Sequence, residues 1–351
     1  MSFDLNAIIR PNIRNLVPYS SARDEFKGEA SVYLDANENS LGSPLIKWYN
    51  RYPDPLQWEV KKKLSAIKGI APEQIFLGNG SDEAIDLLYR AFCEPGIDNV
   101  VICPPTYGMY EVSANINNIK LKKVPLTPGY QLDLEALEEA IDVNTRIIWL
   151  CSPNNPTGNS LNREDVEIVL NNFDGLVVVD EAYINFSRHR SFIPDLVEYP
   201  NLVVLQTLSK AWGLAALRIG MAFASKEIIE VFNRIKPPYN ISQAAQDLVL
   251  EALDRVDDVN DMIRILVEER KTLAEELAKL PQVIQVYPSD ANFLLVKTID
   301  AKGLYRYLVG KGIVVRDRSN VILCDESLRI TVGTPRENQV LIKAIAEFEK
   351  S

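Results

Sequence analysis

Residues 147–156 read Ile-Ile-Trp-Leu-Cys-Ser-Pro-Asn-Asn-Pro, a continuous apolar run that stops at small, polar and cyclic residues. The same pattern recurs at Val100–Cys103, Leu176–Val179 and Leu202–Leu205. Such runs predict strands that are buried on both faces, and helical patterns such as Asn162–Asn171 separate several of them. The sequence therefore predicts an α/β fold with a mainly parallel sheet covered by helices on both sides.

The pattern changes after about residue 240, where long helices and then alternating segments predict a smaller α+β lobe. The expected helices are Ser242–Leu253, Val259–Leu280 and Pro335–Lys350, and the expected strands are Val283–Tyr287, Asn292–Lys297 and Ile313–Arg316. We divide the chain into an N-terminal arm with part of the small domain (1–45), a large domain (46–255) and a small C-terminal domain (256–351).

Composition excludes several classes of function. The 351 residues are 47% hydrophobic and carry a formal net charge of −10, which disfavours binding to nucleic acid or to an anionic membrane. The main basic cluster, Lys61–Lys63, is interpreted as the solvated face of a helix. No apolar stretch is long enough to span a bilayer, and no signal peptide is evident, so we expect a cytoplasmic protein.

The scarcity of metal-binding residues also limits the chemistry. The single histidine, His189, lies between two arginines, and the four cysteines are scattered through apolar runs. We therefore expect a surface histidine, buried free thiols and no metal site. Acid and base catalysis must then fall to Lys, Tyr, Asp or Glu, or to a cofactor.

Residues with possible chemical roles follow the predicted strands, at the edge where parallel sheets bind ligands. A glycine turn leads into a helix at Ser81, which is either an anion seat or an ordinary helix start. Two prolines and a glycine fix the backbone around Asn155, which either directs its side-chain amide or simply forms a rigid turn. Asp180 ends a buried run, where a carboxylate needs a cationic partner or caps the next turn.

Lys210 follows the last of these strands. In a closed pocket near other positive charge, a lysine loses its proton readily and becomes an amine nucleophile. Thr207, Ser209 and Arg218 surround it in the sequence and are suited to bind phosphate oxygens.

Taken together, five segments resemble the fold-type I, class I/II aminotransferases, which use pyridoxal 5′-phosphate (PLP). They are GNGSDE (78–83), PPTYGMY (104–110), SPNNPTG (152–158), VVVDEAY (177–183) and TLSKAWGLAALRIG (207–220), and the resemblance covers nearly the whole chain. It is strongest to the histidinol-phosphate branch of that family. The resemblance implies a large domain with a mainly parallel seven-stranded sheet, a smaller α+β domain and a homodimer.

The resemblance also implies roles for individual residues. Lys210 matches the Schiff-base lysine that moves the substrate proton, and Asp180 matches the carboxylate that keeps the pyridine nitrogen protonated. Asn155 and Tyr183 match groups bound to the phenolic oxygen of the ring, and Tyr107 matches the aromatic residue stacked on it. The implied phosphate site comprises Ser81, Asp82, Glu83, Thr207, Ser209 and Arg218, with Tyr52 contributed by the neighbouring subunit.

Substrate residues are implied in the same way. Arg329 matches the arginine that binds a substrate carboxylate, while Arg316 and Tyr19 match groups that the histidinol-phosphate branch uses, and Asn155 also contacts substrate. The expected reaction transfers an amino group from L-histidinol phosphate to 2-oxoglutarate in histidine biosynthesis, giving imidazole acetol phosphate and L-glutamate. The alternatives are an aromatic amino acid aminotransferase and a threonine-phosphate decarboxylase on the same scaffold.

Overall fold

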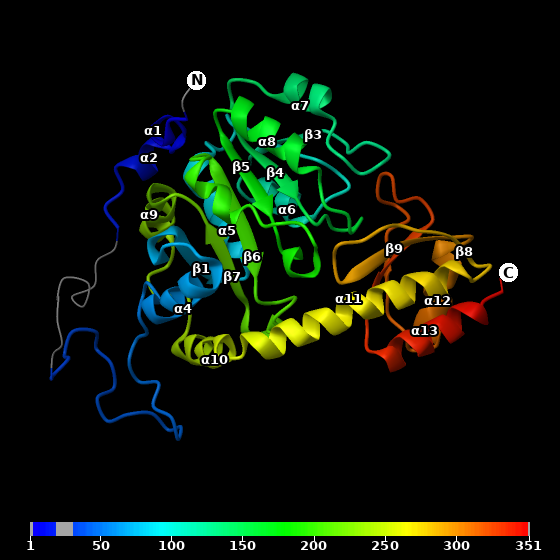
Figure 1. The fold of residues 1–351 in the computed structure, drawn as a ribbon. Helices are drawn as coiled ribbons and strands as arrows, with labels where there is room; N and C mark the ends of the chain where they lie inside the picture. Colours follow the sequence, from blue (N-terminus) through cyan, green and yellow to red (C-terminus); the bar gives the residue numbers. More distant parts are fainter. Residues whose placement is uncertain (1–2, 19–30, 350–351) are drawn as a thin grey trace.

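Two sheets of unequal size organise the structure, a computed structural model that describes residues 3–18 and 31–349 (Figure 1). The larger sheet has seven strands in the order β1-β7-β6-β5-β4-β2-β3. Strand β7 pairs antiparallel with both β1 and β6, whereas the remaining pairs are parallel. The strands are β1 (Ile75–Asn79), β2 (Asn99–Ile102), β3 (Lys120–Lys123), β4 (Thr145–Cys151), β5 (Leu176–Asp180), β6 (Leu202–Thr207) and β7 (Ile219–Phe223).

Helices cover both faces of this sheet, as the continuous apolar strands predict. In β5, Val177 and Val179 belong to the core on one face and Val178 to the core on the other, because side chains alternate along a strand. The first core includes residues of α4 (Trp58–Lys68), α7 (Leu134–Ala140), α8 (Arg163–Asn172) and α10 (Gln243–Leu253). The second includes residues of α5 (Ser81–Phe92), α6 (Met109–Ile116) and α9 (Lys226–Ile235).

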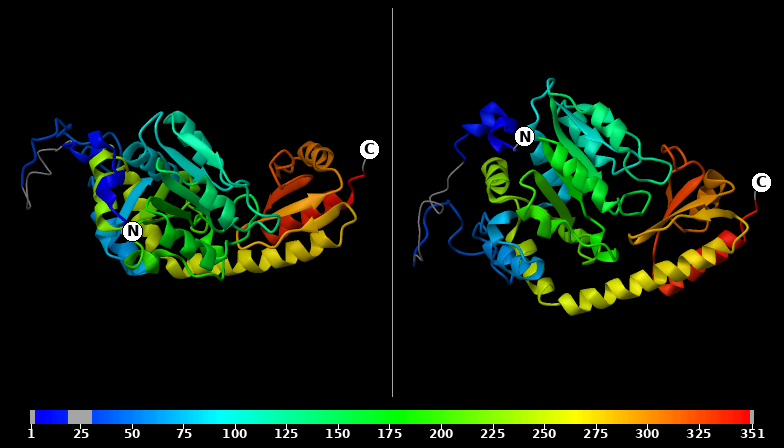
Figure 2. Two further views of the ribbon diagram at one scale, coloured as in Figure 1. Left: turned by 90° about the horizontal axis from the view of Figure 1, so that it is seen from above. Right: turned by 45° about the horizontal axis from the view of Figure 1, so that its top comes forward.

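The smaller sheet is antiparallel and has the order β10-β11-β9-β8. The long helix α11 (Val256–Ala278) runs from the large lobe to this sheet and packs beside it (Figure 2). The other elements of the lobe are β8 (Val283–Val286), β9 (Phe293–Thr298), α12 (Ala301–Gly310), β10 (Arg316–Asp317), β11 (Ser327–Thr331) and α13 (Pro335–Ala346). The α+β lobe is confirmed, and the division of the chain at residues 45 and 255 stays a prediction.

One predicted strand of the small lobe is wrong. The segment Ile313–Arg316 contains no strand before Arg316, and β10 is limited to Arg316–Asp317. Residues 313–315 lack a sheet partner; Ile313 and Val315 pack against the core of the small lobe, whereas Val314 is 79% exposed. High β-propensity alone does not make a strand where there is no neighbour to pair with.

The N-terminal region packs only in part on the large lobe. Helices α1 (Leu5–Ile8) and α2 (Pro11–Arg14) are held there by buried Ile8 and by an ion pair of Arg10 with Glu94. Residues 31–57 contain no helix or strand and extend away from the body (Figure 1). This stretch exposes large apolar side chains, among them Leu41, Ile46 and Trp48.

The structure confirms the expected burial of the cysteines and contradicts the expected exposure of Lys61. All four cysteines are free and buried, as expected. The interpretation of Lys61–Lys63 is wrong for Lys61, which is 2% exposed and whose pKa is lowered to about 8 by burial. Its ammonium lies 5.6 Å from the centre of the Trp58 ring, a contact that offsets part of the cost of burial.

The short 3₁₀ helices are η1 (Pro72–Gln74), η2 (Ile184–Phe186), η3 (Ile193–Val197) and η4 (Ala215–Leu217).

Across residues 3–18 and 31–349, no helix combines the length and the apolar character that crossing a bilayer requires.

Candidate active site

A cavity of about 650 Å³ opens where the carboxyl ends of β4, β5 and β6 face the small lobe. The last residues of these strands, Cys151, Asp180 and Thr207, all line it. Parallel strands place such residues at one edge of the sheet, so the sequence motifs converge there. The predicted site residues that line the cavity are Ser81, Asp82, Tyr107, Asn155, Asp180, Tyr183, Thr207, Ser209, Lys210, Arg218, Arg316 and Arg329.

One end of the cavity has the properties of an anion site. It is formed by the start of α5 at Ser81, by Arg218 and by the Ser209 hydroxyl, which is buried and has no hydrogen-bond partner among the described residues. A Cβ atom on Gly220 would lie 2.0 Å from the Ser81 nitrogen, so only glycine lets β7 approach the helix so closely. Helix N–H groups, a guanidinium and an unused hydroxyl together suit a phosphate group.

The two acidic residues of the same helix have different contacts. Asp82 accepts a hydrogen bond from the Tyr107 hydroxyl (3.0 Å) and pairs with Arg218 at 3.4 Å, so it holds both side chains against the cavity. Glu83 does not line the cavity. Its carboxylate accepts hydrogen bonds from the backbone N–H of Asn79 and from the side-chain amide of Asn240, so its predicted contact with the cofactor stays a prediction.

Asp180 lies on the floor of the cavity and is 2% exposed. Its carboxylate accepts hydrogen bonds from the Tyr110 hydroxyl (2.6 Å) and from the Ala182 N–H (3.1 Å). Burial raises the pKa of Asp180 to about 6, although both hydrogen bonds and the nearby Lys210 oppose that rise. The desolvated carboxylate is therefore suited to a cationic partner in the cavity.

Tyr110 was missed as a site residue in the sequence, although a signal was present. It follows Tyr107 by three residues, a spacing that brings two side chains near each other in a helical turn. The two rings meet edge to face with centres 5.5 Å apart, and Tyr110 also stacks on Trp149. Tyr110 thereby fixes the floor at Asp180 while Tyr107 forms the wall above it.

Lys210 lines the open cavity, where its side chain is exposed to solvent. Partial desolvation and the positive charges of Arg329 and Arg218 lower the pKa of its ammonium, which increases the fraction of neutral amine. The Lys210 nitrogen lies 5.8 Å from the centre of the Tyr183 ring. Burial has the opposite effect on Tyr183, whose pKa is raised, so its hydroxyl stays protonated and able to donate a hydrogen bond.

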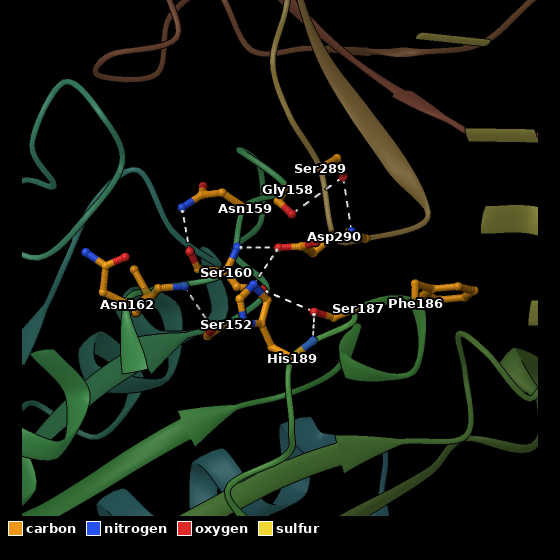
Figure 3. A network of polar contacts seen from close by, with 12 residues as sticks. Ser152, Gly158, Asn159, Ser160, Asn162, Phe186, Ser187, His189, Ser289 and Asp290 are labelled. Atoms are coloured by element: carbon orange, nitrogen blue, oxygen red, sulfur yellow. Dashed lines mark hydrogen bonds and ion pairs between the residues drawn. The ribbon is translucent and has the colours of Figure 1, made fainter. Parts of the chain in front are cut away.

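Residues 158–160, in the loop that also carries Asn155, contact the small lobe (Figure 3). Asp290 of the small lobe accepts a hydrogen bond from the Ser160 N–H and lies 3.7 Å from the His189 side chain. Gly158 has a positive φ, and a Cβ atom there would meet the Ser289 hydroxyl at 2.6 Å. His189 is 64% exposed, as expected for a surface histidine. The loop therefore touches the small lobe at several points close to Asn155.

Basic residues of the small lobe complete the cavity. Arg329 on β11 donates a hydrogen bond to the Asn155 side-chain oxygen, and its guanidinium lies 5.3 Å from the centre of the Phe293 ring. Arg316 on β10 lines the cavity as expected. Arg318 also lines it and was missed. It directly follows β10, and its N–H donates to the Ser327 oxygen, so the extended chain continues and places Arg318 on the same face as Arg316, two residues earlier.

Tyr52 is the second predicted residue, after Glu83, that does not line the cavity. Tyr52 is half exposed and stacks on Tyr239 with ring centres 4.5 Å apart, in a neighbouring hollow that also contains Arg218. Its own chain does not bring it into the cavity, so a contact with the cofactor requires a second subunit. Tyr19 lies outside the described residues, and its role stays a prediction.

These features fit PLP. The cofactor needs an amine nucleophile, an anion site for its phosphate, a carboxylate for its ring nitrogen and donors for its ring oxygen, and the cavity provides each one. Two observations distinguish this cavity from an ordinary cleft. The Ser209 hydroxyl has no hydrogen-bond partner among the described residues, and the buried Asp180 carboxylate forms no ion pair with them. The phosphate and the ring nitrogen of PLP would supply these two partners.

Comparisons with known proteins agree with this geometry. The aminotransferase class I and II family matches residues 41–345. The histidinol-phosphate aminotransferase of Cytophaga hutchinsonii is 55% identical over 99% of this chain and 100% of its own. The crystal structure of the enzyme of that name from Clostridium acetobutylicum has a TM-score of 0.78 at 25% identity and covers 85% of this chain and 90% of that one.

A second solved structure carries the cofactor. The histidinol-phosphate aminotransferase of Sinorhizobium meliloti, in complex with pyridoxal 5′-phosphate, has a TM-score of 0.78 at 24% identity and covers 85% of this chain and 82% of that one, which shows a shared fold. The family match and the identity to the Cytophaga protein extend over nearly the full length of the chain. The chain therefore belongs to the class I and II aminotransferase family.

Proposed function

We propose that this chain is a PLP-dependent histidinol-phosphate transaminase that acts in histidine biosynthesis. The observation that carries the proposal is the meeting of Lys210 and Asp180 with several arginines in one cavity. The 55% identity to the Cytophaga enzyme favours histidinol phosphate over the substrates of the alternative enzymes. The cytoplasmic location expected from the sequence stays a prediction.

Different residues of the cavity would bind different parts of the cofactor. The start of α5 at Ser81, together with Thr207, Ser209 and Arg218, would hold its phosphate. Asp180 would bind the ring nitrogen, with Tyr110 keeping the carboxylate in place through the 2.6 Å hydrogen bond. The ring oxygen would accept hydrogen bonds from Asn155 and Tyr183, and Tyr107 would lie against the ring.

PLP, when bound, supplies an aldehyde that takes up amino groups and a ring that accepts the electrons released when a C–H bond breaks. Lys210 supplies the amine that holds the cofactor and then, once freed, the base that moves the substrate proton. Its lowered pKa serves both roles, because each requires the neutral amine near pH 7. Ionised Asp180 stabilises positive charge at the floor of the cavity.

Arginines of the small lobe would orient the two substrates. Arg329 presents a planar guanidinium that matches the two oxygens of a carboxylate, as in glutamate. Histidinol phosphate has no carboxylate and requires a phosphate site in the same place, which Arg316 and Arg329 can provide. Alternate binding of both substrates in one cavity is what a transaminase requires.

The substrate assignment can be tested with the purified holoenzyme. With histidinol phosphate and 2-oxoglutarate, we expect glutamate formation with a kcat/KM in the usual enzyme range, about 10⁴ M⁻¹ s⁻¹ or higher. Phenylalanine as donor should react much more slowly, and threonine phosphate should release no CO₂. Faster turnover of phenylalanine, or decarboxylation of threonine phosphate, would replace the proposal by the corresponding alternative.

A homodimer with shared active sites is the second part of the proposal. It is supported by the apolar side chains that residues 31–57 expose, and by the position of Tyr52 outside its own cavity. In that dimer, the Tyr52 hydroxyl of each subunit would donate a hydrogen bond to the cofactor phosphate of the other. Tyr52→Phe should then lower PLP affinity about tenfold, as expected for loss of one hydrogen bond to a charged group.

Mixed dimers distinguish sharing between subunits from contact within one subunit. Dimers of one Tyr52→Phe chain and one Lys210→Ala chain should contain one site with both residues intact, and that site should bind PLP with wild-type affinity. If Tyr52 served its own chain, no intact site would form. Monomeric protein in sedimentation experiments would refute the dimer itself.

A further inference from the structure

Three arginines lie on one face at the edge of the small sheet. Arg316 on β10 is paired with Arg329 on β11, and the backbone N–H of Arg318 donates to the Ser327 oxygen, which extends the same ladder by one residue pair. Paired residues share a face of a sheet, and so do residues two apart on a strand. The side chains of Arg316, Arg318 and Arg329 accordingly all line the active-site cavity.

The positive charge of this cluster is not balanced by nearby acids. None of the three arginines forms an ion pair with any residue of 3–18 or 31–349. Burial, followed by repulsion from Arg329 and Arg316, lowers the pKa of Arg318. Asp317 lies between Arg316 and Arg318 on the strand, but it accepts a hydrogen bond from the Ser319 N–H, and alternation directs it to the opposite face. Like charges that face each other on a sheet are destabilising unless an anion lies between them.

Arg318 also has unused hydrogen-bonding capacity. Its Nε atom is buried without a partner among the described residues, and so is the hydroxyl of the adjacent Ser319. Buried donors are nearly always paired in native proteins, so an orphaned guanidinium N–H beside a cavity indicates a ligand acceptor. Arg329, by contrast, already donates to Asn155.

The number of charges exceeds the need of a carboxylate. A carboxylate carries one negative charge and two oxygens, which the fork of a single arginine satisfies. A phosphate monoester carries nearly two negative charges near pH 7 and three terminal oxygens. At the other end of the cavity, Arg218 is paired with Asp82 and belongs to the site for the cofactor phosphate. Three arginines around one position therefore fit the phosphate of a substrate better than one carboxylate of glutamate, whose second carboxylate lies at the other end of its carbon chain.

We propose that Arg318 is a specificity-determining residue whose guanidinium binds the substrate phosphate and so favours phosphate monoesters over carboxylates. This inference rests on the proposed function and deepens it. Arg329 serves both substrates, whereas Arg318 supplies the donor for the additional phosphate oxygen. Loss of Arg318 should therefore slow the reaction of histidinol phosphate and leave the reaction of glutamate nearly unchanged.

The test uses the holoenzyme with Arg318→Gln, which keeps a polar side chain and removes the charge. We expect kcat/KM for histidinol phosphate to fall about 10- to 100-fold, mainly through KM, and the rate with glutamate as donor to change by less than about threefold. Arg318→Lys should recover part of the loss. Arg264→Gln, at an exposed arginine of α11, is the matched control and should leave both substrates unaffected.

A binding measurement separates this inference from the proposed function. Inorganic phosphate should inhibit the reaction of the wild-type holoenzyme with glutamate, and Arg318→Gln should weaken that inhibition about tenfold or more. Undiminished inhibition by phosphate, or equal losses for histidinol phosphate and glutamate, would overturn the role of Arg318. If the wild-type enzyme failed to use histidinol phosphate while phosphate inhibition still depended on Arg318, the proposed function would fail and the phosphate site would stand.

Discussion

Replacing Lys210 with alanine is expected to abolish transamination, lowering kcat by about 10⁴-fold or more, because both the nucleophilic amine and the general base are lost. The remaining contacts of the cavity do not involve this side chain. Ser81, Ser209 and Arg218 still face the phosphate position, and Asp180 still lies on the floor. PLP should therefore bind noncovalently to the variant.

Two measurements check this expectation. Glutamate formation reports the loss of turnover, and dialysis or denaturation should release PLP from the variant without any covalent adduct to the protein. Lys226→Ala, at an exposed lysine on α9, is the control and should behave as the wild type. Turnover by Lys210→Ala within tenfold of the wild-type rate would remove Lys210 from the proposed mechanism.

Replacing Asp180 with asparagine is expected to lower kcat about 10²- to 10³-fold, a typical result when one preorganised charge of a water-excluded site is removed. Asparagine keeps the size of the side chain and can still accept a hydrogen bond from Tyr110. It cannot provide the negative charge that holds a protonated ring nitrogen. Binding of PLP should weaken as well, because the variant lacks the ion pair.

Without cofactor, the same substitution should alter the pH dependence of stability. The pKa of Asp180 is raised from its ordinary value of 3.8 to about 6, so between these values the folded apoprotein binds more protons than the unfolded chain. The contribution of Asp180 to stability therefore falls as pH rises from about 4 to about 6, and is then constant. The difference in Tm between apo Asp180→Asn and apo wild type should shift in favour of the variant over that range. A difference independent of pH would show that Asp180 ionises normally in the fold.

The sequence predicts the large lobe well because its strands are buried on both faces. A run such as Leu176–Val179 has no polar position, and only a central strand or a buried helix accommodates it. The motifs of the site could also be predicted from the sequence, because glycines and prolines mark the strand ends where the chain must turn. The segment Ile313–Arg316 was predicted wrongly because local propensity does not specify a pairing partner.

The burial and the roles of single side chains could not be predicted from such patterns, because they depend on tertiary contacts. Lys61 is charged in the sequence, and only the packing of α4 shows that it is buried. Tyr110 acts through Asp180, which lies 70 residues further along the chain, and Arg318 is brought beside Arg329 only by the pairing of β10 with β11. Tyr52 lies outside the cavity of its own chain, so the role proposed for it would require a second subunit.

The reversed direction of β7 places two anchors of the site on one short piece of chain. Because β7 runs against β6, its first residue lies at the edge of the sheet where β6 ends, so the connection between them begins and ends beside the cavity. Lys210 and Arg218 both lie on that connection, whereas a parallel strand would have required a crossover around the sheet. A single loop thus sets the separation between Lys210, which would bind the cofactor covalently, and Arg218, which would bind its phosphate. An insertion between Lys210 and Arg218 would displace one anchor relative to the other, so we expect this loop to tolerate insertions poorly.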